Sequence, residues 1–112
     1  MKALIMPLAV LSVVAISGPT AMASERLIEG RQAYQLMCAQ CHETGIAGVP
    51  QTRNTADWAD RSHLWEGVLF EHAEKGYLQM PARGGNESAS DYDVEAAAEY
   101  MLTVTYPDMT HD

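Results

Sequence analysis

Cys38-Ala39-Gln40-Cys41-His42 is the stretch of this sequence that decides its fold. It holds both cysteines of the 112-residue chain, with a histidine directly after the second. Because the chain has no third cysteine, neither thiol has a distant cysteine with which to pair. Two thiols and an imidazole this close together can bind one group at the same time. The spacing therefore predicts a single site built from Cys38, Cys41 and His42.

The C-x-x-C-H spacing is typical of covalent haem attachment. The two thiols can add to the two vinyl groups of one haem, and His42 can then reach its iron from one face. A thiol–disulfide oxidoreductase would place such cysteines at the start of a helix in a βαβ unit. A structural zinc site would need four ligands, and the other histidines show no partnered spacing. We therefore predict one haem c, bound through Cys38 and Cys41, with His42 on the iron.

A second iron ligand must come from elsewhere in the chain if both haem faces are closed. A methionine paired with a histidine raises the reduction potential, because the thioether stabilises reduced iron. Met80 lies in a predicted loop, far enough along the chain to reach the other face. The other methionines after the predicted leader are Met37, Met101 and Met109. We predict Met80 as the ligand, and coordination by His63 or His72 at a lower potential is the alternative.

Helical patterns dominate the chain. Residues 25–37 carry apolar side chains three or four positions apart, which predicts a helix that ends at the cysteines. Residues 43–55 are rich in glycine and are predicted to form a loop. Residues 94–105 are rich in alanine and predict a final helix, which Pro107 would end. No convincing period-two strand occurs, so the sequence predicts an all-α domain.

Polar residues mark where the remaining helices should begin. Thr55 is predicted to cap a short helical turn, and Ser62 the helix after it. Gly76 would end that second helix. Ser90, with an acidic residue three positions later, is predicted to cap the last helix. Residues 80–86 should be irregular, because Pro81 disfavours a helical conformation for the residue before it.

The first 23 residues are predicted to be a signal peptide. A basic start is followed by an apolar run over residues 3–16 and by Ala21-Met22-Ala23, which resembles a cleavage site. The apolar run is shorter than the roughly 20 residues needed to span a bilayer. We therefore expect export to the periplasm, cleavage after Ala23, no stable membrane insertion and a haem-binding domain of residues 24–112. An uncleaved N-terminal anchor is the alternative.

The charge balance is strongly acidic. The formal net charge is −8, and loss of Lys2 with the leader would make it −9. Such a surface repels nucleic acid and anionic lipid, and it favours partners with basic docking surfaces. The charge bears on association and does not identify a fold.

Around the attachment stretch the chain resembles the class I c-type cytochromes, and among them the short bacterial cytochrome c5 type. The resemblance spans residues 30–100 and is carried by five runs: Gly30-x3-Tyr34-x3-Cys38-x2-Cys41-His42, Thr44-Gly45-x2-Gly48-x-Pro50, Trp58-Ala59-x-Arg61, Met80-Pro81-x2-Gly84-Gly85-Asn86 and Asp93-Val94-x-Ala96-Ala97-x2-Tyr100-Met101. It implies a small fold of about four helices wrapped around one covalently bound haem. Many c5-type proteins also carry a cysteine pair before the last helix, which this sequence lacks.

The resemblance also implies roles for single residues. The carbonyl of Pro50 is expected to accept a hydrogen bond from the ring of His42. Trp58 and Arg61 are expected near the haem propionates, where an indole N–H or a guanidinium can stabilise charge. The alternative for these two is a core aromatic and a surface charge. The implied helix contacts are those of Gly30 and Tyr34 with Ala97 and Tyr100.

A haem closed on both faces has no open position for a substrate, so the expected activity is outer-sphere transfer of single electrons. We therefore predict a monomeric electron carrier that is not an enzyme and that exchanges electrons with redox proteins at the haem edge. One alternative is a dedicated electron-accepting subunit of an exported dehydrogenase or reductase. Another is a haem enzyme or gas sensor with a weak sixth ligand.

Overall fold

Helices make up almost all of the regular structure in this computed structural model, which describes residues 2–14, 19–59 and 66–108. The helices are α1 (Pro19–Met37), α2 (Ala39–His42), α3 (Thr55–Trp58), α4 (Glu66–Lys75) and α5 (Asp91–Thr105), with 3₁₀ turns η1 (Ile46–Gly48) and η2 (Ala82–Gly85). In these ranges the only extended pairing is an isolated bridge between Tyr77 and Met80. The all-α prediction is confirmed. Five helices are described rather than about four, because a turn at Cys38 separates α2 from α1.

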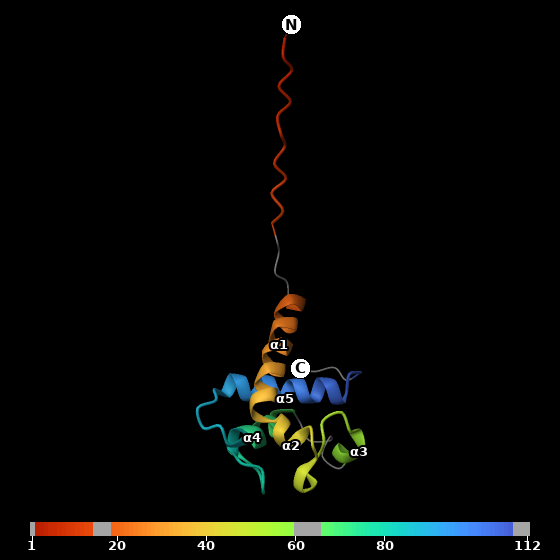
Figure 1. Cartoon of the computed structure of the whole chain (residues 1–112), viewed down its shortest axis with the longest axis vertical. Helices are drawn as coiled ribbons and strands as arrows, with labels where there is room; N and C mark the ends of the chain where they lie inside the picture. The colour runs from red at the N-terminus through yellow and green to blue at the C-terminus, as the bar shows by residue number, and fades with distance from the viewer. Residues whose placement is uncertain (1, 15–18, 60–65, 109–112) are drawn as a thin grey trace.

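The helices α1 and α5 cross against each other and form the core (Figure 1). A Cβ atom added at Gly30 would lie 2.2 Å from the carbonyl oxygen of Ala96, so only glycine permits this approach. The ring centroids of Tyr34 and Tyr100 lie 5.2 Å apart, and Ala97 is fully buried. The implied packing of the two helices is therefore present, with Ala96 rather than Ala97 closest to Gly30.

Both long helices begin ahead of the sequence runs that predicted them. The helix α1 starts at Pro19 rather than at residue 25, and proline is favoured in the first position of a helix. The helix α5 starts at Asp91, directly after its predicted cap Ser90 and ahead of the alanine-rich run from residue 94, and acidic side chains in its first turn favour the positive end of the helix dipole. Ser90 caps α5 as predicted, because its hydroxyl accepts the N–H of Asp93 at 3.1 Å. The helix α1 continues across the proposed cleavage point, and removal of residues 1–23 stays a prediction.

The ends of the shorter helices follow the sequence in part. The cap of α3 is Asn54 and not Thr55, because the Asn54 side chain accepts the N–H of Asp57 at 3.3 Å and Thr55 is already helical. Gly76 follows the last residue of α4 with φ of 86°, which confirms the predicted stop. Ser62 lies outside the described residues, so its predicted cap is untested.

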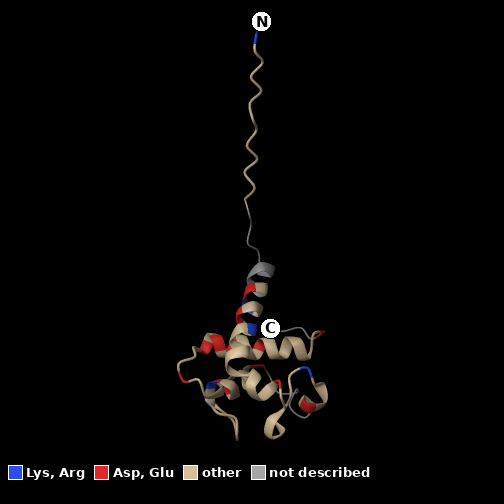
Figure 2. Cartoon of the chain, viewed as in Figure 1, with Lys and Arg blue, Asp and Glu red and all other residues tan. Residues whose placement is uncertain are grey.

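Charge is distributed unevenly over the molecule (Figure 2). The acidic residues of the three longest helices are Glu25 and Glu29 on α1, Glu66, Glu71 and Glu74 on α4, and Asp91, Asp93, Glu95 and Glu99 on α5. In contrast, residues 44–52 and residues 76–82 contain no charged side chain. We call these two segments the uncharged loops.

The N-terminal segment lies apart from the helices. Residues 2–14 form no helix and extend away from the rest of the chain (Figure 1). No helix in the described ranges is both long enough and apolar enough to cross a membrane. All residues that line the candidate site lie in the helical domain and not in this segment.

Candidate haem site

A cavity of about 1070 Å³ lies between α2, α4, α5 and the uncharged loops. Its walls include Cys38, Cys41, His42 and Met80, the four residues predicted to bind haem. Apolar and aromatic side chains supply much of the remaining wall, among them Val49, Trp58, Leu69, Val94 and Leu102. The volume is at the upper end of the roughly 300–1,000 Å³ typical of small-molecule and cofactor sites. The fold thus brings the predicted residues to one large, mainly apolar cavity.

His42 has one ring nitrogen engaged and the other available. The residue is buried, and its Nδ1 lies 2.7 Å from the carbonyl oxygen of Pro50. A carbonyl can only accept, so Nδ1 carries the proton and Nε2 keeps its lone pair. Burial lowers the pKa of His42, and the hydrogen bond to Pro50 opposes this only in part. The ring is therefore neutral and oriented, as an iron ligand requires.

Four consecutive residues hold the segment that contains His42. Each forms one hydrogen bond with His42 or Glu43: Pro50 O with His42 Nδ1, Gln51 Nε2 with Glu43 O at 2.7 Å, Thr52 N with His42 O at 2.8 Å, and Arg53 Nη1 with Glu43 Oε1 at 2.6 Å. We call residues 50–53 the His42 clamp. The expected contact between Pro50 and the His42 ring is one member of this larger set.

A buried tyrosine ties the His42 clamp to α1. The hydroxyl of Tyr34 lies 2.7 Å from Oε1 of Glu43 and 2.9 Å from Oγ1 of Thr52. It donates to the Glu43 carboxylate, which can only accept, and accepts from the hydroxyl of Thr52. Chiefly through burial, the pKa of Tyr34 is raised well above its usual value, so the hydroxyl stays protonated near neutral pH. The segment around His42 is thereby fixed to the core.

Arg53 ties the same clamp to α5, a role that the sequence analysis did not assign. Its Nη2 donates to the hydroxyl of Tyr100 at 3.0 Å, and its backbone N–H donates to Oγ1 of Thr105 at 3.0 Å. These partners are 47 and 52 positions away in the chain. No local sequence pattern predicts contacts over such a separation.

The two cysteines lie side by side at the cavity and differ in exposure. Cys38 is partly buried at the cavity wall, whereas Cys41 is exposed. Burial, with a smaller contribution from Cys41, raises the pKa of Cys38 to about 11. A thiol–disulfide oxidoreductase needs the opposite shift, toward the thiolate. In the described part of the chain, no three His, Cys, Asp or Glu residues are grouped to hold a metal ion. Neither rival use of the cysteine pair is supported by this geometry.

Met80 lies at the end of a tight hairpin that follows α4. The N–H of Tyr77 donates to the carbonyl of Met80 at 3.0 Å, and the N–H of Met80 donates back at 2.9 Å. Between them Leu78 is 88% exposed and adopts φ of 52°, which is uncommon for a leucine. The ring of Tyr77 stacks on His72 of α4, with centroids 3.8 Å apart and planes 7° apart. We call residues 77–80 the Met80 hairpin.

The competing ligand candidates occupy different surroundings. Met37 is buried in the core between α1 and α5 and does not line the cavity. Met101 lines the cavity from within α5, where it packs against the core. His72 also lines the cavity, with its ring stacked on Tyr77. Met109 and His63 lie outside the described residues. Met80 is thus the candidate that a loop, rather than a helix, presents to the cavity.

Of the two residues expected near the propionates, the structure describes Trp58 but not Arg61. Trp58 lines the cavity, with its ring centroid 5.9 Å from that of His42. Its indole N–H donates to the carbonyl of Gln51 at 3.0 Å, and its expected role beside a propionate stays a prediction. An indole has a single N–H, which the clamp already engages. Arg61 lies outside the described residues, and its role stays a prediction.

The donor set and the cavity fit a haem. One wall supplies a neutral imidazole with a free Nε2, a loop supplies a thioether, and two unpaired thiols lie beside the imidazole. The apolar lining suits a porphyrin ring. The hydroxyl of Tyr106, a cavity residue, is buried without a hydrogen-bond partner among the described residues. A carboxylate-bearing cofactor is a natural source of such a partner.

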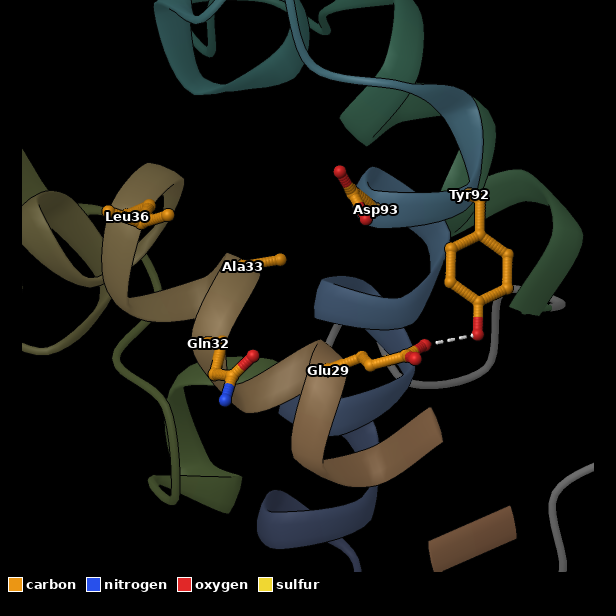
Figure 3. Close-up of a pocket in the computed structure, with 6 residues that line it drawn as sticks. All are labelled: Glu29, Gln32, Ala33, Leu36, Tyr92 and Asp93. Carbon is orange, nitrogen blue, oxygen red and sulfur yellow. Dashed lines mark hydrogen bonds between the residues drawn. The ribbon is translucent and has the colours of Figure 1, made fainter. Parts of the chain in front are cut away.

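A second depression has none of these properties. It is a shallow groove of about 360 Å³ between α1 and the first turn of α5 (Figure 3). Its lining is Glu29, Gln32, Ala33, Leu36, Tyr92 and Asp93. Tyr92 donates to Glu29 across it at 2.5 Å, which links the two helices. No thiol, imidazole or thioether lines the groove, so the chemistry of the molecule is concentrated in the large cavity.

Comparison with known proteins agrees with this site. A family profile described as "Cytochrome C oxidase, cbb3-type, subunit III" matches residues 25–101. Cytochrome c-555 of Chlorobaculum tepidum is 38% identical over 77 residues, which cover 65% of this chain and 71% of that protein. Cytochrome c5 of Ectopseudomonas mendocina is 30% identical over 66 residues, which cover 57% of this chain and 76% of that protein.

A solved structure is also similar. It is described as "Crystal structure of electron transfer complex of nitrite reductase with cytochrome c", and the matched chain has a TM-score of 0.63 and 30% sequence identity. The match covers 69% of this chain and 94% of the other. This chain therefore belongs to the class I c-type cytochromes, small electron-transfer proteins with covalently bound haem c. Within that class, its relatives place it near the cytochrome c5 type.

Proposed function

We propose that this protein is a monomeric periplasmic electron carrier that moves single electrons between redox proteins and catalyses no reaction of its own. The observation that carries this proposal is one cavity lined by Cys38, Cys41, His42 and Met80. Haem c supplies an iron that alternates between the ferrous and ferric states and so holds one electron at a time. The protein contributes attachment, two ligands and a mainly apolar enclosure.

Each attachment residue has a defined task. Cys38 and Cys41 would hold the haem through thioether bonds, in which each thiol adds across one vinyl group so that sulfur bonds to one carbon and the thiol hydrogen to the other. His42 would ligate the iron through Nε2, while its Nδ1 donates to Pro50 and fixes the plane of the ring. Met80 would supply a second ligand from its hairpin. An iron held by both residues would leave no position for a substrate, which favours a carrier over an enzyme or gas sensor.

The surface around the cavity suits brief contact with another protein. The uncharged loops border the cavity and expose apolar side chains, with Ile46 58%, Tyr77 51% and Leu78 88% accessible. The acidic helices carry the charge that would steer a partner with a basic docking surface (Figure 2). The similar solved structure is described as an electron transfer complex of nitrite reductase with cytochrome c, which supports a redox enzyme as the class of partner.

Export and cleavage complete the proposal. The apolar leader and its Ala21-Met22-Ala23 sequence support secretion and removal of residues 1–23. The periplasm is where haem attachment to an exported chain would take place. The acidic charge of the remaining domain supports a soluble monomer, since it opposes self-association.

The test is maturation in a host that attaches haem to exported proteins. We expect an intact mass equal to residues 24–112 plus one haem, and a low-spin spectrum typical of histidine–methionine coordination. The double variant Cys38→Ala, Cys41→Ala should be exported without the added mass. A colourless wild-type product from a host that matures a control cytochrome would refute the proposal. If the protein instead eluted from size exclusion in a stable complex with one partner, it would be a dedicated subunit of that partner and not a free carrier.

A further inference from the structure

We propose that Arg53 is a positioning residue that keeps the Pro50 carbonyl on the ring of His42. The inference rests on the proposed role of His42 as an iron ligand. It concerns the guanidinium and backbone of Arg53, which join three parts of the fold at the edge of the haem site. Neither the sequence pattern nor the resemblance to cytochromes c assigned a role to this residue.

The backbone of Arg53 is in a conformation that an arginine rarely adopts. Its φ is 69°, in the left-handed region where a Cβ atom is disfavoured and where glycine is the usual residue. Its N–H donates at 3.0 Å to Oγ1 of Thr105, a residue that is 6% exposed in α5. Backbone strain of this kind persists only where the surroundings determine it, and it is concentrated at functional sites. The left-handed backbone at Arg53 is therefore held in place by its surroundings, among them the contact with Thr105.

The side chain of Arg53 links the segment after His42 directly to α5. One guanidinium nitrogen donates to Glu43, directly after His42, and the other donates to the hydroxyl of Tyr100 in α5. The ion pair alone is half exposed, and an isolated pair of that kind contributes little to stability. Its importance lies in geometry, because Oε1 of Glu43 also accepts from the buried Tyr34 hydroxyl. Arg53 thus fastens one end of the His42 clamp to both long helices.

At the other end of the clamp, Pro50 contacts the ring of His42, the proposed iron ligand. Pro50 stands three positions before Arg53, and its carbonyl accepts the Nδ1 proton of His42 at 2.7 Å. This hydrogen bond makes the imidazole a stronger donor to a metal, which stabilises the oxidised form. If Arg53 is lost, the loop loses its anchors to Glu43 and Tyr100, and the Pro50 carbonyl can move. The reduction potential should then rise, whereas loss of a methionine ligand should lower it.

The test compares Arg53→Ala and Arg53→Gly with the wild-type holoprotein. Glycine removes the guanidinium and relieves the strain, so agreement between the two variants assigns the effect to the side chain. We expect exchange of the His42 Nδ1 proton, followed by NMR in the reduced state, to accelerate about 2- to 12-fold, the equivalent of one hydrogen bond. The midpoint potential should rise, measured at high ionic strength to screen the lost charge.

Two further variants keep the test independent of general stability. Tyr100→Phe removes one acceptor of the guanidinium and keeps the ring, so a smaller acceleration is expected. Arg26→Ala is the matched control, because Arg26 pairs with Glu99 and lies over the ring of Tyr92 across α1 and α5, away from the clamp. This control should leave the exchange rate of the His42 Nδ1 proton unchanged. Equal acceleration in Arg26→Ala, or none in Arg53→Ala, would overturn the proposal. A wild-type spectrum without histidine ligation would instead refute the proposed function, before any variant is made.

Discussion

The two proposed iron ligands reach the same cavity by different means. His42 is buried at 8% exposure, and its segment is fastened by the clamp to Tyr34 of α1 and, through Arg53, to α5. Met80 belongs to a hairpin closed by two backbone hydrogen bonds and supported by one ring stack on α4. The neighbouring Leu78 is 88% exposed. Regions with few buried contacts open at lower free energy than the core, so the Met80 side should open first.

This contrast separates two tasks of an electron carrier. The His42 side lies next to the covalent attachment and has to remain intact for the haem environment to persist. In the proposed coordination, the Met80 side controls whether the sixth position on the iron is filled, and with it a large part of the reduction potential. A weaker Met80 side allows substitutions there to adjust the potential without loosening the attachment. The predictions below test this asymmetry.

The largest effect should follow from Met80→Ala. Removal of the thioether opens the sixth position, so we expect carbon monoxide to bind the reduced protein and the potential to fall. The weak ferric absorption at about 695 nm, which reports methionine sulfur on iron, should disappear. Met101→Leu is the control, because Met101 lines the same cavity from α5 and should keep the band. If the band survives in Met80→Ala and is lost in Met101→Leu, the ligand is Met101.

A smaller effect is expected from Gly84→Ala in η2, which follows the Met80 hairpin. A Cβ atom at Gly84 would lie 2.2 Å from the carbonyl oxygen of Met37, and the residue has φ of 62°. Overpacking of this kind costs about 1–3 kcal/mol of unfolding free energy. Gly85→Ala is a matched control, since Gly85 has φ of 86° and no atom within 4 Å of its would-be Cβ. Urea unfolding should show a larger loss of unfolding free energy for Gly84→Ala than for Gly85→Ala. Equal losses would mean that strain alone, and not the contact with α1, is responsible.

A third, still smaller effect should come from the ring stack. His72→Ala removes the partner of Tyr77, and an aromatic pair contributes about 0.5–1.5 kcal/mol beyond its buried area. We expect the band at about 695 nm to vanish at a lower temperature than in the wild type, with little change in global unfolding. His72→Phe retains a ring and should behave like the wild type. A wild-type melting profile of the band in His72→Ala would show that the hairpin needs no support from α4.

The smallest effect concerns acid stability on the His42 side. Hydrogen bonds from Arg53 and then Tyr34 hold the pKa of Glu43 below its usual value of 4.5. Between the folded and unfolded values the unfolded chain binds more protons, so this stabilisation is present above about pH 4.5 and is lost as the pH falls further. The contribution is small because Glu43 is largely exposed. The unfolding free energies of the wild type and Glu43→Gln, measured in urea across pH 3–6, should therefore converge at the acid end. A constant difference over that range would exclude the carboxylate as the source.

The sequence predicted the reactive residues of the site better than the hydrogen bonds that hold them in place. The spacing of Cys38, Cys41 and His42 is local, and their placement at one cavity with Met80 follows from a short list of residues able to bind iron. Whether they bind it stays a prediction. The cap at Ser90 was also readable from a local pattern, whereas the close approach at Gly30 was implied by the resemblance to the cytochromes.

The remaining features depend on contacts between distant segments. Arg53 meets α5 across 47 and 52 positions, and nothing in its neighbours indicates the left-handed backbone that makes this possible. The indole N–H of Trp58 donates to the nearby carbonyl of Gln51, a contact that the sequence analysis did not predict. The start of α1 was placed too late, because residues 19–24 form a helix although they lack its apolar spacing.

The short reach of the His42 clamp has a consequence for how the protein is made. Most of its hydrogen bonds join residues no more than 18 positions apart, such as that between Tyr34 and Thr52. Contacts that are local in sequence form early, because little loop entropy is lost in closing them. A chain exported as we propose can therefore assemble the half that presents the thiols and imidazole before α4 and α5 are available. Cofactor attachment can precede completion of the fold, and the second half then closes over a haem already in place.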